Sequence, residues 1–161
     1  MTDAESLKFF GNKHPFSNFA PYPLTIDGKT YPTPEHYFQA AKFIDTDPDY
    51  AEEIRLAATP GIAKKLGKSR KHVIDPDWNN NRIKVMGFVI FTKVLQYPDF
   101  LSYLVSTGDK ILIEASPFDA YWGDPSAAGR KKKGKNMLGK VYMCLRHVLK
   151  DYEDTIYVSS E

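Results

Sequence analysis

The sequence has few of the features that mark secreted, membrane-spanning or metal-binding proteins. Its single cysteine, Cys144, excludes an internal disulfide, and we expect this side chain to be a small buried hydrophobe within a helix. The N-terminus has no basic region followed by an apolar run, so no signal peptide is visible. No stretch approaches the roughly 20 apolar residues of a membrane span. These absences favour a soluble protein of the cytoplasm or the nucleus.

Motifs for metals and nucleotide cofactors are also missing. The four histidines are scattered without ligand spacing, so we expect no metal site. No Walker motif and no dinucleotide fingerprint occurs, and we expect no cofactor. The net charge of +2 argues neither for nor against nucleic acid. The 161 residues, 26% charged and 42% hydrophobic, fit one ordinary globular domain.

Periodicity and capping residues predict a compact, mainly helical α+β domain with a few short strands. We expect a hairpin around Asp27-Gly28 and a strand over 110–116. The longest predicted helix lies within 77–97, with Ile83, Met86, Val89 and Ile90 on its core side. The domain is predicted over 9–150, between a flexible N-terminus at 1–8 and a frayed acidic tail at 151–161. The other predicted helices run from 34 to about 44, over 48–58, over 60–66, over 98–105 and from 136 to 149.

The helix that begins at Pro34 carries an unusual polar stripe. Thr33 is a good N-cap, and Glu35 falls one place short of the capping-box position, so capping does not use its carboxylate. Helical spacing places two sets of residues on opposite faces. We expect the apolar set to face the core, while the polar set is either solvated surface or one wall of a site. The first set is Tyr37, Ala40, Ala41 and Ile44; the second is Glu35, Phe38, Gln39 and Lys42.

Three further segments could carry chemistry, and each also has a simpler structural interpretation. Ser17 and Asn18 in "SNF" are common turn formers. The stretch "DAYWGD", residues 119–124, offers either a stacking face or a loop anchored by a buried tryptophan. The basic stretch "GRKKKGKNMLG", residues 129–139, is either solvated charge or an anion site at a helix that Asn136 caps.

Taken together, these segments resemble the NADAR family, also called the YbiA-like family. The matching elements follow the order of the family and cover roughly 9–149 of this chain. They are "FSNF" (16–19), "EHYFQAAKF" (35–43), "DW" (77–78) with Arg82 and Met86, "TGD" (107–109), "EASPFDAYWG" (114–123) and "GKNMLGK" (134–140) with Arg146. The resemblance implies a compact, mainly helical α+β fold and hydrolysis of N-glycosidic bonds between ribose and a base or amine.

The resemblance also implies roles for individual residues. Glu35, Lys42 and Asp119 look like catalytic residues, with Glu35 as proton shuttle and Lys42 as nucleophile or electrostatic clamp. Asp119 is expected to orient ribose hydroxyls, Trp122 to stack on a base, and Asn136 with the backbone at Gly134 and Lys135 to hold phosphate. The remaining residues expected to bind substrate are Phe10, Ser17, Asn18, Phe19, Phe38, Gln39, Trp78, Tyr121, Gly123, Leu138 and Gly139.

The loop "PSAAGRKKK", residues 125–133, departs from the family's pattern because it is longer and more basic. Clustered cations gain from counterion release on a polyanion, which favours nucleic acid. The resemblance implies two activities, removal of ADP-ribose from guanine bases and hydrolysis of phosphorylated ribosylamino intermediates of riboflavin synthesis, and the basic loop favours the first. We therefore expect a monomeric hydrolase that removes ADP-ribose from guanine bases of nucleic acid or nucleotides, with ADP-ribose as product and no membrane partner. One alternative is an N-glycosidase acting on phosphorylated ribosylamino intermediates of riboflavin synthesis. The other is a non-catalytic module that binds ADP-ribose or NAD.

Overall fold

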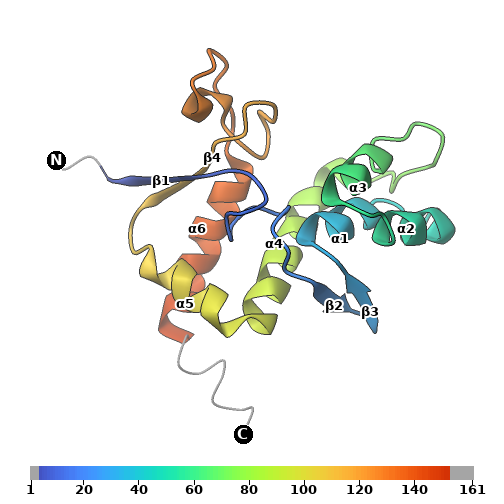
Figure 1. The fold of residues 1–161 in the computed structure, drawn as a ribbon, viewed down its shortest axis with the longest axis horizontal. Helices are drawn as coiled ribbons and strands as arrows, with labels where there is room; N and C mark the ends of the chain where they lie inside the picture. The colour runs from blue at the N-terminus through green and yellow to red at the C-terminus, as the bar shows by residue number, and fades with distance from the viewer. Residues whose placement is uncertain (1–3, 153–161) are drawn as a thin grey trace, which may run out of the picture. The chain divides into compact units, whose positions relative to one another are not determined.

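A computed structural model describes residues 4–152 and confirms a mainly helical α+β chain (Figure 1). Most of the predicted elements are present, and many of them begin at a proline. Within the described residues the α-helices are α1 (Pro34–Ala40), α2 (Pro48–Arg55), α3 (Pro60–Leu66), α4 (Trp78–Gln96), α5 (Pro98–Ser106) and α6 (Met137–Leu149). The strands are β1 (Ser6–Phe9), β2 (Leu24–Ile26), β3 (Lys29–Tyr31) and β4 (Ile111–Glu114), and the short 3-10 helices are η1 (Pro125–Ala128) and η2 (Lys150–Tyr152).

The chain divides into two compact units. The central unit is the continuous stretch Asn18–Lys93, and the terminal unit combines the chain before Asn18 with the chain after Lys93. No helix in the described residues is long and apolar enough to cross a membrane.

The central unit consists of the β2–β3 hairpin, helices α1 to α3 and most of α4. Asp27 and Gly28 both have positive φ, which the two-residue hairpin turn requires. Thr33 and Thr59 cap α1 and α3, and in each case the side chain accepts a hydrogen bond from the backbone N–H three residues later. Helix α1 packs against both α2 and α3. The central unit therefore holds α1, with its polar stripe, between two other helices.

The terminal unit combines a strand from the N-terminal part of the chain with elements from its C-terminal part. Strand β1 pairs in parallel with β4, with Ser6 opposite Ile111, and α6 packs against β4. Aromatic side chains fill its core: the Phe16 ring lies 4.8 Å from Tyr142 and 5.0 Å from Tyr103, centroid to centroid. The Tyr142 hydroxyl donates to the Phe16 carbonyl at 2.9 Å.

Several expectations about local structure are corrected. Helix α1 ends at Ala40 rather than near residue 44, because the chain tightens into turns in which the Lys42 N–H donates to Gln39 O, three residues back. Ile83, expected in the core, is 40% exposed, and Cys144, expected to be buried, lies at the surface. Residues 6–8, assigned to a flexible N-terminus, belong to β1. The predicted tail lies mostly outside the described residues, which include 151 and 152 in η2.

Candidate active site

The polar stripe of α1 is buried, and its carboxylate is hydrogen-bonded. Glu35 is 6% exposed and Gln39 4%, and the Gln39 side-chain amide donates to Glu35 Oε1 at 2.6 Å. The Glu35 N–H donates to the Asn18 carbonyl at 3.1 Å, which ties this first turn to the "SNF" segment. A carboxylate held in place this way, out of bulk water, is suited to move a proton or to stabilise a cation.

Lys42 lies just beyond the end of α1, half-buried between α3 and the start of α4. Its Nζ donates to the Gly67 carbonyl at 3.1 Å and lies 5.8 Å from the centroid of the Trp78 ring. Trp78 also packs against Phe38, with ring centroids 5.2 Å apart. The structure thus brings together five residues predicted from sequence, namely Glu35, Phe38, Gln39, Lys42 and Trp78.

The surroundings of Lys42 favour its neutral form. Burial lowers the pKa of the Lys42 ammonium below its ordinary value, and nearby Lys68 and Lys64 lower it further. Glu35 acts in the opposite direction, since an anion stabilises the ammonium. The net direction is downward, as a lysine that acts as a nucleophile requires.

Two buried oxygens near this stripe have no hydrogen-bond partner among the described residues. They are Gln39 Oε1 and Asn18 Oδ1, while the Asn18 amide nitrogen donates to the sulfur of Met86 at 3.2 Å. Buried polar atoms are usually satisfied, so each such atom calls for an explanation. A bound hydroxyl or N–H donor of a substrate would supply the missing partner.

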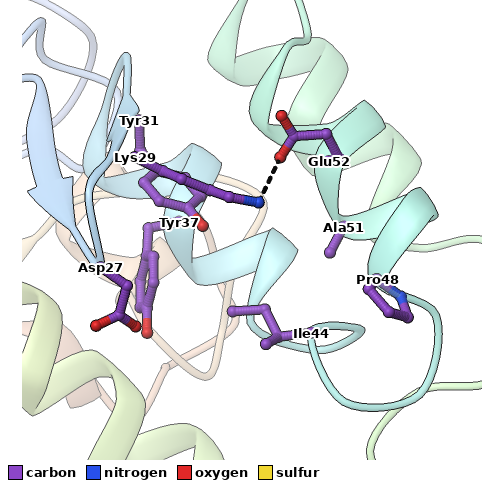
Figure 2. A pocket seen from close by; sticks show the side chains of 8 residues that line it. All are labelled: Asp27, Lys29, Tyr31, Tyr37, Ile44, Pro48, Ala51 and Glu52. Carbon is purple, nitrogen blue, oxygen red and sulfur yellow. Dashed lines mark hydrogen bonds and ion pairs between the residues drawn. The ribbon is translucent and has the colours of Figure 1, made fainter.

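The opposite face of α1 corrects the predicted arrangement of its two stripes. Ala40 is buried as expected, but Ile44 is 39% exposed and Tyr37 half-buried. Tyr37 and Ile44 line an open pocket of about 190 Å³ on this face, which Figure 2 shows together with the Lys29–Glu52 ion pair. None of the site residues predicted from sequence lines this pocket. The stripe of Glu35, Phe38 and Gln39, for which solvated surface was one of two predicted interpretations, is therefore buried.

In the terminal unit, Asp119 organises the loop that carries Tyr121 and Trp122. Its Oδ1 accepts from the N–H groups of Tyr121 and Trp122 at 2.9 and 2.8 Å, and its own N–H donates to Ser116 Oγ at 3.1 Å. The two aromatic rings meet edge to face with centroids 4.9 Å apart, and both are half-buried. The loop is therefore fixed internally, and the roles of Asp119 and Trp122 toward ribose and base stay predictions.

The predicted phosphate site has its backbone donors in use. The N–H groups of Gly134, Lys135 and Asn136 donate to Asp124 Oδ1, Ala120 O and Gly123 O at 2.9, 2.8 and 3.0 Å. The side chain of Asn136 bonds to the backbone of β4, with Oδ1 accepting from Glu114 N–H and Nδ2 donating to Leu112 O. A phosphate here would need other donors, such as the exposed side chain of Lys135.

The remaining predicted residues differ in their exposure and in their local contacts. Phe10 is 52% exposed, and Ser17 is buried with its N–H donating to His14 O. Phe19 is half-buried, with Lys64 Nζ 5.7 Å from its ring centroid. In the terminal unit, Gly123, Leu138 and Gly139 are buried; a Cβ on Gly139 would lie 2.1 Å from Leu112 O, so close packing against β4 explains this glycine.

Sequence reasoning missed four residues that surround Lys42 or share its unit. Gly67 supplies the carbonyl to Lys42, and a Cβ there would lie 2.0 Å from Gln39 Oε1. Lys64 and Lys68 act on Lys42 through space. Lys93 is fully buried with Nζ 4.3 Å from the Tyr22 ring centroid, and burial lowers its pKa to about 7. For Lys64 and Lys68, the cluster of basic residues at 64–71 was a signal that the sequence offered. Residues 4–152 contain no cluster of ligands that could hold a metal ion.

Comparison with known proteins agrees with the resemblance seen in the sequence. The model of the NADAR domain matches residues 7–150, which span both units. The N-glycosidase YbiA of Escherichia coli is 42% identical over 134 residues, covering 83% of this chain and 80% of that protein. An N-glycosidase of Nostoc punctiforme is 36% identical over 137 residues, covering 84% and 85%.

Two further relatives extend the comparison. The riboflavin biosynthesis protein PYRR of Zea mays is 38% identical over 144 residues, covering 81% of this chain and 22% of that protein. The solved NMR structure of E. coli YbiA matches with a TM-score of 0.83 and 34% identity, covering 100% of this chain and 94% of that one. This chain therefore belongs to the NADAR family and is an enzyme, an N-glycosyl hydrolase.

Proposed function

We propose that this N-glycosidase removes ADP-ribose from guanine bases in nucleic acid or nucleotides. The observation that carries the proposal is the buried, hydrogen-bonded pair of Glu35 and Gln39 beside Lys42. Burial of Lys42 lowers the pKa of its ammonium group. Exposed cations in the same chain favour a polyanionic substrate, since Arg130, Lys131 and Lys132 are all at the surface.

The proposed mechanism uses Lys42 as nucleophile and Glu35 as proton shuttle. The ribose ring opens as the C1–O4′ bond breaks: its electron pair stays on O4′, which takes a proton from Glu35, and the lone pair of the guanine nitrogen makes C1 an iminium carbon. Neutral Nζ of Lys42 adds its electron pair to C1, and the proton it loses passes through Glu35 to the guanine nitrogen. The bond from C1 to guanine then breaks, with its electrons on guanine, and leaves a Schiff base between C1 and Lys42. Water adds to C1, and the amine leaves as ADP-ribose is released.

A simpler mechanism has water attack C1 directly. Lys42 then stays protonated and stabilises charge on the leaving group, while Glu35 activates the water. The lowered pKa of Lys42 favours the covalent mechanism, because burial disfavours the charged ammonium that a clamp requires and favours the neutral amine that a nucleophile requires.

A second candidate function is cleavage of phosphorylated ribosylamino intermediates of riboflavin synthesis. The observation that favours it is similarity to proteins with riboflavin names, the maize PYRR protein and a riboflavin biosynthesis protein of Vibrio vulnificus that is 35% identical over 136 residues. The longer basic loop favours the larger, more strongly charged substrate instead. A pure ADP-ribose reader would have no need for both Glu35 and Lys42.

The test is to incubate the enzyme separately with an ADP-ribosylated guanine oligonucleotide and with the riboflavin intermediate, and to resolve the products by mass. We expect release of ADP-ribose from guanine. Cleavage of the riboflavin intermediate alone would establish the second function. Tight binding of ADP-ribose without cleavage of either substrate would identify a reader.

A further inference from the structure

A second basic surface lies in the central unit, next to Lys42. It comprises the five cations of the segment 64–71, called here the α3 basic segment: Lys64, Lys65, Lys68, Arg70 and Lys71. Lys64 is half-buried and the other four are exposed, at the end of α3 and in the green loop that follows it in Figure 1.

Within residues 4–152, no ion pair involves a cation of the α3 basic segment. Lys29, in the same unit, differs because it is paired with a carboxylate: its Nζ lies 3.1 Å from Glu52 Oε2 (Figure 2). A group of exposed cations without counter-charges carries a local excess of positive potential that attracts anions.

The start of the loop is held firmly to the rest of the central unit. The Leu66 carbonyl accepts from the Tyr50 hydroxyl at 2.7 Å, and the Gly67 carbonyl accepts from Lys42 Nζ at 3.1 Å. The loop therefore begins directly beside the proposed nucleophile.

The end of the loop is held as well. The His72 ring stacks on Tyr50 with centroids 3.5 Å apart and bonds to Asp47 at 2.7 Å. The Asp75 N–H donates to the Lys42 carbonyl at 2.7 Å. Both ends of the loop thus meet the segment that carries Lys42, and the cations between them lie on ordered backbone. A preordered surface loses less entropy when a ligand binds.

We propose that the α3 basic segment binds the phosphodiester backbone of a single-stranded nucleic acid and leads the strand past Lys42. This inference rests on the proposed function, because it supplies the strand that carries the modified guanine. The pyrophosphate of ADP-ribose alone would need only the cations beside Lys42, which are Lys64 and Lys68. Of the other three, Lys65 lies in the last turn of α3, and Arg70 and Lys71 lie in the loop, where successive phosphates of a strand would pass.

The test is a triple variant, Lys65→Ala, Arg70→Ala and Lys71→Ala, which leaves the cations beside Lys42 in place. Affinity for an unmodified, fluorescein-labelled single-stranded DNA is measured by anisotropy over a series of salt concentrations. The loss of three phosphate contacts should reduce the slope of log K against log salt by about 2. Turnover of an ADP-ribosylated guanine mononucleotide should stay within about twofold of the parent protein, because the removed groups lie outside the reacting centre.

A matched control removes three exposed lysines elsewhere, Lys8, Lys84 and Lys140, and lowers the net charge equally. It should change the slope much less. An unchanged slope in the test variant, or an equal change in the control, would overturn the inference. An equal loss on the mononucleotide would assign the segment to the pyrophosphate or to the fold.

Failure of the proposed function gives a different result. Binding to unmodified DNA requires no cleavage, so a parent protein that binds through this segment but releases no ADP-ribose would support the strand site and refute the guanine activity.

Discussion

At the scale of single residues, the chemistry depends on one amine held in a partly dry environment. Lys42→Arg keeps the positive charge but removes a nucleophile that can become neutral, because guanidinium stays protonated. Under the covalent mechanism this variant should lose at least a thousandfold in kcat, about 4 kcal/mol of transition-state stabilisation, and still bind ADP-ribose. Steady-state turnover and calorimetric binding of ADP-ribose would measure the two effects.

Borohydride added during turnover of the parent enzyme should trap an adduct between ribose C1 and Lys42, which peptide mass spectrometry would locate. Glu35→Gln should strongly lower kcat under either mechanism, so this variant cannot distinguish between them. An active Lys42→Arg enzyme with no trapped adduct would leave Lys42 as an electrostatic helper.

The pH dependence of kcat should show the effect of the neighbouring cations on the pKa of Lys42. If the neutral amine is the reacting form, activity rises with pH as Lys42 loses its proton. Lys68 lowers the pKa of Lys42, so Lys68→Ala should raise that pKa and move the rising limb of kcat to higher pH. The shift is measured at low ionic strength, where screening is weakest. Lys65→Ala removes an equal charge from the same segment and should leave the limb in place.

Gly67 offers a test of geometry rather than charge. Its φ of −62° suits any residue, but a Cβ would lie 2.0 Å from Gln39 Oε1. Gly67→Ala should displace the Gln39 amide from Glu35 and lower kcat on the order of tenfold to a hundredfold, with little change in Tm because Gln39 is a flexible side chain.

Gly61→Ala, within the α3 helix that Gly67 follows, is the matched control. Its Cβ would meet only Thr59 Oγ1 at 3.8 Å, so the change should leave activity intact and stabilise α3 by about 0.5–1 kcal/mol. Equal activity of the two variants would show that the Gln39 position does not matter for turnover.

At the scale of elements, the loop that follows η1 carries the other basic surface. Lys131, Lys132 and Lys133 are exposed, and their replacement by Ala should weaken binding to a modified oligonucleotide about tenfold to a hundredfold at moderate salt and flatten its salt dependence. Turnover of a mononucleotide should change much less. Titrations with both substrates would separate the effects, and equal losses on both would mean that the loop serves the pyrophosphate or the fold.

At the scale of the whole molecule, the sequence predicted well those features that depend on neighbouring residues in the chain. Thr33-Pro34 and Thr59-Pro60 mark the starts of α1 and α3, and Gly67 follows the last residue of α3. Asp27-Gly28 forms the hairpin turn. Each of these signals acts within a few residues, so the conformation depends little on the rest of the chain.

Features that depend on distant residues were harder to predict. Periodicity divides α1 into two stripes, but it does not show which of the two is covered by other helices. The apolar stripe was predicted to face the core because apolar residues are usually buried. The fold instead buries Glu35 and Gln39, and the Gln39 side chain lies against Gly67, which follows α3. The contact of Lys42 with Gly67 joins positions 25 residues apart, and no local pattern encodes it. The resemblance therefore named Trp78 and the residues of the α1 polar stripe, but it did not name Gly67, Lys64 or Lys68 beside Lys42.

The parallel pairing of β1 with β4 has a consequence for how the protein is made. On a ribosome, β1 emerges long before β4, so its backbone groups and the side chain of Phe9 must wait for their partners. The stretch Asn18–Lys93 is continuous and is complete in the nascent chain before β4 has been synthesised. During that interval β1 is an unpaired strand open to proteases, to holdase chaperones and to the same strand of a neighbouring nascent chain.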